Sequence, residues 1–380
     1  MPDHGSSLVT ARGLRILVTG ATGLVGGELC RRLMLRGHRV LALVRGDGAI
    51  RPAEGGPLAG VERLRGDVRD PPDPSAVPPF DLLLHAAAVT GFGAPEALAR
   101  AVNVGGTARL LALAEARGAA FLHVGTAYVC GAQDGAVDEA PASPDACHRN
   151  AYEATKAEAE RLVLAAAARG LCAAVARPSI VVGLHGSGAV PRFDGIYALL
   201  RLAGEGRVSA MPAAPGATLD LVPLCHVADG LCDVAERMAA ARGRVFHLAS
   251  GAPVALAAFC AVARHLPGFA APRLVAPDGF DAARLPPDER WWHERVVCLF
   301  APYMRQGPRF ATDGLRALSG RVCPPVDAAF LRRLCLFAVR AGFLRPQRLP
   351  LEPLWPQPPW RQPLRPQQPP LPQPSLPQPL

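Results

Sequence analysis

The stretch Leu14-Arg-Ile-Leu-Val-Thr-Gly20-Ala-Thr-Gly23-Leu-Val-Gly26 decides the fold of this chain. Its first six residues form an apolar run that predicts a buried strand, and an amphipathic helix pattern follows the glycines. In this setting Gly20 permits a tight turn, Gly23 lets the backbone approach a pyrophosphate, and Gly26 lets the helix pack closely on the strand. The helix N-terminus adds free N–H groups and positive potential. We therefore expect a dinucleotide to bind along this loop, at Gly20, Thr22, Gly23, Leu24, Val25 and Gly26.

Strand and helix patterns alternate outward from this loop. Further buried strands are predicted at residues 40–44, 82–86, 120–124, 173–176 and 245–248. Helices are predicted at residues 24–36, 95–117 and 151–169, each followed by a glycine where helices commonly end. This alternation predicts an α/β fold, a doubly wound, Rossmann-like parallel sheet with helices on both faces.

The same patterns divide the chain into regions. We expect a dinucleotide-binding domain over residues 14–185, with a late strand near 219–250, and a smaller substrate-binding region over 186–218 and 251–345. Residues 1–13 are polar and lack periodicity, which predicts a disordered arm. Residues 346–380 hold 14 Pro and 7 Gln, which predicts an extended, polyproline-like tail without a core. The sequence does not identify a partner for this tail.

Composition and charge exclude several classes of protein. The 41 basic and 32 acidic side chains give a net charge of +9, but the basic residues are scattered, so no nucleic-acid partner is expected. Ten Cys without metal-type spacing predict reduced thiols, no metal site and a cytoplasmic protein. The longest run without Asp, Glu, Lys or Arg, residues 245–263, is broken by Ser250-Gly-Ala-Pro253, so no membrane span is predicted. Whether the chain forms a homodimer stays open.

The ends of the next strands indicate which dinucleotide binds. An acidic residue after the second strand would accept bonds from ribose hydroxyls, whereas an Arg there accommodates a 2′-phosphate. Arg45 stands at this position, which favours NADP(H) over NAD(H), although Asp47 follows closely. Asp67, beside Val68 at the end of the third strand, is expected to accept from the adenine amino group. Small residues that leave space for the cofactor follow the fourth strand, at Ala86 and Ala87.

Candidate catalytic residues lie at and after the fifth strand. Thr126 places a hydroxyl just beyond this strand, at the sheet edge where open α/β folds bind ligands. Tyr152 and Lys156 are four residues apart, on one face of a predicted helix, so the ammonium is expected to lower the phenol pKa. Lys156 is also the single Lys beside 40 Arg, and the two Asn of the chain are Asn103 and Asn150.

Together these residues resemble the extended short-chain dehydrogenase/reductases. The match rests on the glycine loop, Gly66-Asp67, Asn103-Val-Gly-Gly-Thr107, Thr126, Tyr152 with Lys156, and Arg177-Pro178-Ser-Ile180. By this resemblance Thr126 and Tyr152 would bond a substrate carbonyl, Tyr152 would donate a proton, and Lys156 would also hold the nicotinamide ribose. Asn103 would order the proton path, and the backbone at Pro178, Ser179 and Ile180 would meet the nicotinamide amide.

Within that superfamily the chain looks most like the acyl-thioester reductases, which include the fatty acyl-CoA reductases of the male-sterility group. His123-Val-Gly-Thr-Ala-Tyr-Val-Cys-Gly131 and Phe193-Asp-Gly-Ile-Tyr197 carry this likeness, with Gly125 in place of the usual Ser. It implies an NADPH-dependent, free-standing reductase that converts a thioester of CoA or of a carrier protein to an aldehyde or alcohol. The region 280–305 is expected to set substrate choice.

Three alternatives to a thioester reductase remain. A ketone or hydroxysteroid reductase would need only the same Thr, Tyr and Lys. A nucleotide-sugar epimerase would use the same scaffold, but it normally keeps NAD tightly bound, which Arg45 argues against. A non-catalytic dinucleotide sensor would not need the intact pair of Tyr152 and Lys156.

Overall fold

A seven-stranded parallel sheet forms the centre of the computed structural model, which describes residues 13–345. Its strands are β1 (Arg15–Thr19), β2 (Arg39–Val44), β3 (Glu62–Arg65), β4 (Leu82–His85), β5 (Ala120–Val124), β7 (Ala173–Pro178) and β12 (Val245–Leu248). They lie in the order β12-β7-β5-β4-β1-β2-β3, and every neighbouring pair is parallel. The chain reverses its direction of travel across the sheet between β1 and β4, where ligands bind in folds of this kind. The predicted fold class is confirmed.

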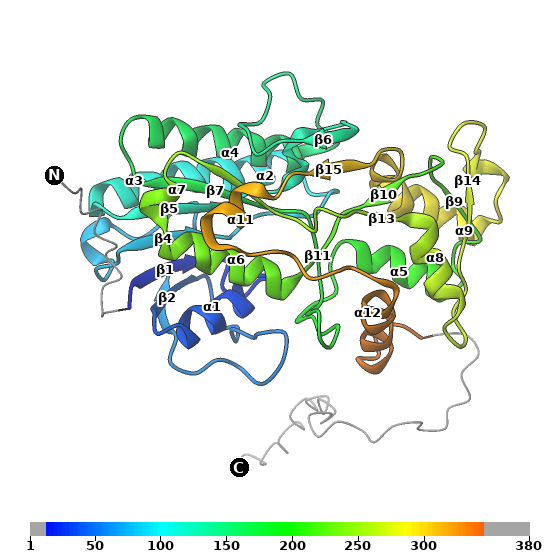
Figure 1. Cartoon of the computed structure of the whole chain (residues 1–380), viewed down its shortest axis with the longest axis horizontal. Helices are drawn as coiled ribbons and strands as arrows, with labels where there is room; N and C mark the ends of the chain where they lie inside the picture. The colour runs from blue at the N-terminus through cyan, green and yellow to red at the C-terminus, as the bar shows by residue number, and fades with distance from the viewer. Residues whose placement is uncertain (1–12, 346–380) are drawn as a thin grey trace, which may run out of the picture.

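Helices cover both faces of this sheet (Figure 1). The helices α1 (Gly26–Leu35) and α6 (Leu224–Glu236) pack on one face, and α3 (Gly106–Arg117) and α4 (Ala151–Ala168) pack on the other. Alternation along β1 explains the two faces, because Ile16 and Val18 join the first core and Leu17 joins the second. The short helix α11 (Asp313–Ser319) also packs on the first face, through Leu315.

The helix predicted over 95–117 is divided into three segments. α2 (Glu96–Ala99) is followed by a π-helical segment (Arg100–Gly105) and then by α3. A π-helical segment accommodates an extra residue, and such segments often lie at functional sites. Asn103 lies in this segment. The helix α3 ends as expected at Gly118, which takes the left-handed conformation with φ of +59°.

The rest of the described chain builds a smaller body beside the carboxyl ends of the sheet strands. Its strands pair in twos: β8 (Ile180–Val182) with β11 (Leu221–Pro223), β9 (Ala210–Pro212) with β14 (Arg273–Val275), β10 (Thr218–Leu219) with β13 (Val254–Ala255), and β6 (Gly135–Val137) with β15 (Pro308–Phe310). Its helices are α5 (Ile196–Gly204), α8 (Leu256–Arg264), α9 (Pro287–Trp292), α10 (Cys298–Phe300) and α12 (Ala328–Arg340). The short helix α7 (Met238–Ala241) follows α6 and packs with it on the central sheet. Figure 1 shows α5, α8, α9 and α12 gathered at one end of the molecule.

The predicted N-terminal arm, apart from residue 13, lies outside the described part of the chain, and so does the predicted tail over 346–380.

Within residues 13–345, no helix combines the length and the apolar character needed to cross a bilayer. In the same residues no cluster of His, Cys, Asp or Glu is arranged to hold a metal ion, and all ten Cys are free thiols.

Candidate active site

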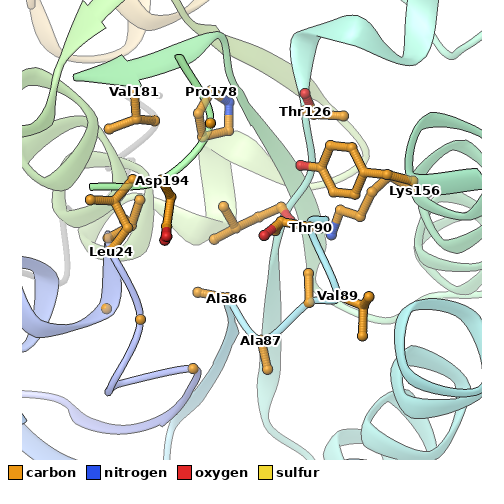
Figure 2. A pocket seen from close by; sticks show the side chains of 18 of the residues that line it. Leu24, Ala86, Ala87, Val89, Thr90, Thr126, Lys156, Pro178, Val181 and Asp194 are labelled. Carbon is orange, nitrogen blue, oxygen red and sulfur yellow. Dashed lines mark hydrogen bonds between the residues drawn. The ribbon is translucent and has the colours of Figure 1, made fainter. Parts of the chain in front are cut away.

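A cavity of about 560 Å³ opens at the carboxyl ends of the central strands, between the sheet and the smaller body. Figure 2 shows Leu24 and Asp194 on one side of it, with Thr126 and Lys156 on the other. Of the predicted site residues, all except Asn103 line this cavity. They are Gly20, Thr22, Gly23, Leu24, Val25, Gly26, Arg45, Asp67, Val68, Ala86, Ala87, Thr126, Tyr152, Lys156, Pro178, Ser179 and Ile180.

The glycine loop between β1 and α1 fits a pyrophosphate. Gly20 has φ of +75°, and a Cβ there would lie 2.6 Å from the backbone nitrogen of Ala87. A Cβ at Gly26 would lie 2.0 Å from the carbonyl oxygen of Gly20, so the first turn of α1 can approach β1 only with glycine at this position. No side chain caps α1, which leaves its first N–H groups facing the cavity and available to an anion.

The far end of the cavity, where β2 and β3 end, includes the side chain of Arg69, which was not predicted from the sequence. Arg69 lines the cavity, and it binds Asp67 through Nε at 3.1 Å and its backbone N–H at 2.8 Å, both to Oδ1. The hydrogen bonds from Arg69 hold the pKa of the Asp67 carboxyl below its usual value. Arg45 is exposed at the same end, whereas Asp47 points into solvent, does not line the cavity, and pairs with Arg65 at 3.5 Å. The cavity therefore presents two arginines where the second strand ends.

Thr126 and Tyr152 lie together on the opposite wall. Thr126 caps the short 3-10 turn η3 (Ala127–Cys130), and its Oγ1 accepts from the backbone N–H of Tyr128 at 3.4 Å. Burial raises the pKa of Tyr152 to about 12, and a hydrogen bond with Thr126 opposes this rise. The net shift is therefore opposite in direction to the one predicted from Lys156, because burial dominates. Tyr152 stays protonated at neutral pH.

Lys156 is turned toward the sheet as well as toward the cavity. Its Nζ donates to the carbonyl oxygen of Val124 at 2.6 Å and lies 3.1 Å from Nε2 of His123. The side chain is 2% exposed, and burial lowers the pKa of the ammonium to about 7. Both contacts place Nζ at the end of β5.

Asn103 lies behind the cavity wall. Its Oδ1 accepts from the backbone N–H of Val89 at 2.8 Å, and its Nδ2 donates to Val89 O at 3.1 Å and to Oγ1 of Thr155 at 3.0 Å. The amide thus joins the segment after β4 to the helix α4. Val102 rather than Asn103 lines the cavity, so Asn103, which the sequence placed among the cofactor-binding residues, does not itself form part of the cavity wall.

Aromatic rings form a wall of the cavity near Tyr152. Phe92 stacks on Tyr303 with ring centroids 5.1 Å apart, and it also contacts Phe300 at 5.4 Å and Tyr152 at 6.2 Å. Phe300 and Tyr303 come from the region 280–305, whereas Trp291 of that region is 46% exposed and does not line the cavity. Sequence reasoning missed Phe92, which follows β4 by only a few residues, since a lone Phe in a Gly-rich turn carries no signal of its own.

Comparison with known proteins agrees with this fold and with a reductase. The family model described as male sterility protein matches residues 77–231. A 4-hydroxy-2-methyl-3-oxo-4-farnesyl-3,4-dihydroquinoline-1-oxide ketoreductase of Stigmatella aurantiaca is 33% identical over 77% of this chain and 85% of its own length. A 2-alkyl-3-oxoalkanoate reductase of Stenotrophomonas maltophilia is 35% identical over 51% of this chain and 59% of its own length.

A solved structure supports the same architecture. The terminal R domain from the myxalamid PKS-NRPS biosynthetic pathway superposes with a TM-score of 0.74 at 24% identity, covering 89% of this chain and 93% of that domain. The sheet order, the glycine loop and the extensive likeness to a named ketoreductase lead to one assignment. The chain belongs to the extended short-chain dehydrogenase/reductases and is an NAD(P)-dependent oxidoreductase, and its residues 77–231 match the family model described as male sterility protein.

Proposed function

We propose that this reductase uses NADPH to reduce the carbonyl of an apolar acyl thioester, bound to CoA or to a carrier protein. The match of the male-sterility model over residues 77–231 carries this proposal, since these residues include Thr126, Tyr152 and Lys156. The aromatic wall supports an apolar acyl group, because Phe92, Phe300 and Tyr303 present rings rather than charges beside Tyr152.

The residues present would perform the reduction in two stages. Bound NADPH supplies a hydride to the carbonyl carbon. Thr126 and Tyr152 donate hydrogen bonds to the carbonyl oxygen, and Tyr152 gives its proton to this oxygen as negative charge develops there. The ammonium of Lys156 stabilises the resulting phenolate. The hydroxyl of the hemithioacetal then returns its proton to the phenolate of Tyr152 as the C–S bond breaks, and the departing thiolate takes a proton from water. An aldehyde, a free thiol and NADP⁺ remain.

The arginines at the far end of the cavity support NADPH as the reductant. Arg45 follows β2 directly and is exposed, so a 2′-phosphate on the adenosine ribose can reach its guanidinium. The guanidinium of Arg69 lies at the same end, bound to Asp67. Asp47, the carboxylate that would instead favour an unmodified ribose, pairs with Arg65 outside the cavity.

A ketone is the second candidate substrate, and a specific observation favours it. The names of both relatives reported above describe the reduction of an oxo compound, and the alignment with one of them covers most of this chain. Ketone reduction needs the same proton donor and the same apolar wall but breaks no C–S bond. A nucleotide sugar is a poorer match, because its polar sugar would lie against Phe92, Phe300 and Tyr303.

Measuring thiol release separates the two candidates. The protein is incubated with NADPH and a panel of medium-chain and aromatic acyl-CoA thioesters and ketones, and NADPH absorbance is followed. Free CoA is quantified in the protein-free filtrate, because the ten Cys of the chain would otherwise react with thiol reagents. We expect equal molar CoA release and NADPH oxidation in the first step, and none with Tyr152→Phe. Oxidation of NADPH by ketones alone would assign the second candidate and reject the first.

A further inference from the structure

Two histidines lie side by side behind the catalytic residues. His85 ends β4, His123 occupies the matching position on β5, and both side chains are 0% exposed. Their ring centroids are 5.4 Å apart. Burial lowers the pKa of both imidazoles, to about 3 for His85, so both are neutral at physiological pH. Neutral rings have one donor and one acceptor nitrogen, and the surrounding hydrogen bonds decide which is which.

The hydrogen bonds of His85 are complete without Lys156. Thr107 donates its hydroxyl proton to the carbonyl oxygen of Asn103 at 2.6 Å, so its Oγ1 accepts from Nε2 of His85 at 3.1 Å. Nδ1 of His85 then accepts from Thr19 at 2.7 Å, and Oγ1 of Thr19 accepts from the backbone N–H of Ala87 at 3.2 Å. His85 therefore belongs to the packing between β1, β4 and α3.

His123 has the opposite arrangement. Its Nε2 lies 3.1 Å from Nζ of Lys156, and its Nδ1 is a buried atom without a partner. An ammonium only donates hydrogen bonds, so when Lys156 is charged Nε2 accepts and Nδ1 carries the proton. An unpartnered buried N–H is costly, which indicates that the contact at Nε2 is what retains the ring in this tautomer.

The surroundings of Nζ contain no carboxylate contact. Its two hydrogen-bond partners, His123 Nε2 and Val124 O, are neutral acceptors. Among the ionisable groups around it, His85 lies on β4, Tyr152 lies one turn earlier on α4, and Glu160 lies one turn later. Glu160 is bound by Arg177 of β7, with Nε and Oε2 2.7 Å apart, so it does not neutralise Lys156 by direct contact. Because both contacts are with neutral acceptors, neither cancels the positive charge of the protonated Lys156.

We propose that His123 is a positioning residue for Lys156, whose neutral Nε2 accepts from Nζ and holds the ammonium at the end of β5. Without this acceptor Nζ would keep only the carbonyl of Val124, and the charged form would be less stable. The inference rests on the proposed function only in assigning Lys156 to the reaction. Its direct test uses no substrate and no cofactor, so the two can fail separately.

The single Lys makes the test direct, because protein labelled with [¹³Cε]lysine gives one side-chain signal, that of Lys156. Its chemical shift is followed between pH 5 and pH 10 in the wild type, His123→Phe and His123→Gln, with any affinity tag free of Lys. We expect His123→Phe to lower the pKa of Lys156 by about one unit, the worth of one hydrogen bond to a charged group. His123→Gln should restore most of it, because its Oε1 can accept from Nζ.

A matched control is His226→Phe. His226 is 4% exposed on α6, its pKa is also lowered by burial, and its Nδ1 likewise lacks a partner, but it does not line the cavity. This variant should lose stability and leave the Lys156 titration unchanged. An equal titration in the wild type and in His123→Phe would overturn the proposal.

A second measurement reads the tautomer in the wild type, needs only His123→Gln for the assignment, and remains decisive if His123→Phe does not fold. In protein labelled with [¹⁵N]histidine, the imidazole signal missing from His123→Gln belongs to His123. We expect the Nδ1–H tautomer, without protonation down to pH 5. The Nε2–H tautomer would exclude acceptance from the ammonium and overturn the proposal.

Discussion

Lys156 is the single Lys of a chain with 40 Arg, and its surroundings fit an ammonium better than a guanidinium. Nζ fits between His123 Nε2 and Val124 O, in a site where the side chain is 2% exposed. A guanidinium is planar, wider and always charged, with donors that point in fixed directions. It could not make both bonds and still leave room beside Tyr152.

We therefore expect Lys156→Arg to lower kcat about 100-fold, because a catalytic group misplaced by about 1 Å costs this much. Arg161→Lys is the control, since Arg161 is exposed on the same helix α4, and we expect it to keep full activity. Steady-state rates with NADPH and the best substrate of the panel measure both. A fully active Lys156→Arg would show that any cation serves at this position.

The proposed preference for NADPH is tested at Arg45, also at the scale of a single residue. Replacing it by Asp removes a partner of the 2′-phosphate and adds an acceptor for ribose hydroxyls. We expect Arg45→Asp to weaken NADPH binding about 10- to 100-fold, as for a lost hydrogen bond between charged groups, with NADH binding unchanged or improved. Arg39→Asp, at the exposed start of the same strand, should change neither Kd measured by cofactor fluorescence. Equal losses for both cofactors would reject the role of Arg45.

At the scale of elements, Asn150 begins the helix that carries the reaction. Its Oδ1 accepts from the backbone N–H of Glu153 at 3.0 Å, and its Nδ2 donates to the hydroxyl of Tyr303 at 2.8 Å. The first bond caps α4, and the second joins α4 to the smaller body. Tyr152 is the second residue of this helix, so the cap also fixes where the phenol stands.

We expect Asn150→Ala to lower the free energy of unfolding by about 1 kcal/mol, the usual worth of an N-cap, and also to lower kcat. Asp327→Ala removes the matching cap of α12, where Oδ1 accepts from the N–H of Phe330 at 2.8 Å. It should cost similar stability in urea denaturation without lowering kcat. If the two variants lose activity equally, the cap of α4 has no special relation to Tyr152.

These elements show which features could be predicted from the sequence. The glycine loop, α4 and the apolar strands of the central sheet could be predicted because each is a local pattern of consecutive residues. The π-helical segment at Arg100–Gly105 could not, since one extra residue in a helix leaves the apolar periodicity almost unchanged. The pKa of Tyr152 was predicted in the wrong direction because burial, which raises it, depends on the whole cavity wall. Arg69 was also missed, although a local argument could have found it, because it follows Asp67 by only two residues.

At the scale of the whole molecule, one buried cluster joins the helix α4 to the smaller body. Tyr303 belongs to the 3-10 turn η6 (Ala301–Met304), and its hydroxyl donates to Oε1 of Glu153 at 2.6 Å. Glu153 is 0% exposed and also accepts from Arg149, whose guanidinium lies 5.0 Å from the centre of the Tyr303 ring. No sequence pattern shows this contact, because about 150 residues separate its partners.

Tyr303→Phe tests whether the contacts of this cluster hold α4, and with it Tyr152, in position at the active site. The ring and its stacking on Phe92 remain, but the buried carboxylate of Glu153 loses a donor, so we expect the free energy of unfolding to fall by about 1–3 kcal/mol. Because Glu153 follows Tyr152 directly on α4, kcat should fall as well, while the Kd for NADPH stays unchanged. Tyr303→Ala, which also removes the ring, should raise KM for apolar substrates.

Tyr197→Phe is the matched control for this prediction. Tyr197 is also buried, on α5, and its hydroxyl accepts from the backbone N–H of Gly183 at 3.0 Å, but it does not line the cavity. Loss of this hydroxyl removes an acceptor from a neutral N–H rather than a donor from a buried carboxylate, so the cost should be smaller and kcat should not change. Urea denaturation, steady-state kinetics and cofactor titration compare the variants. If Tyr303→Phe and Tyr197→Phe behave alike in all three, the smaller body only covers the cavity and does not position α4.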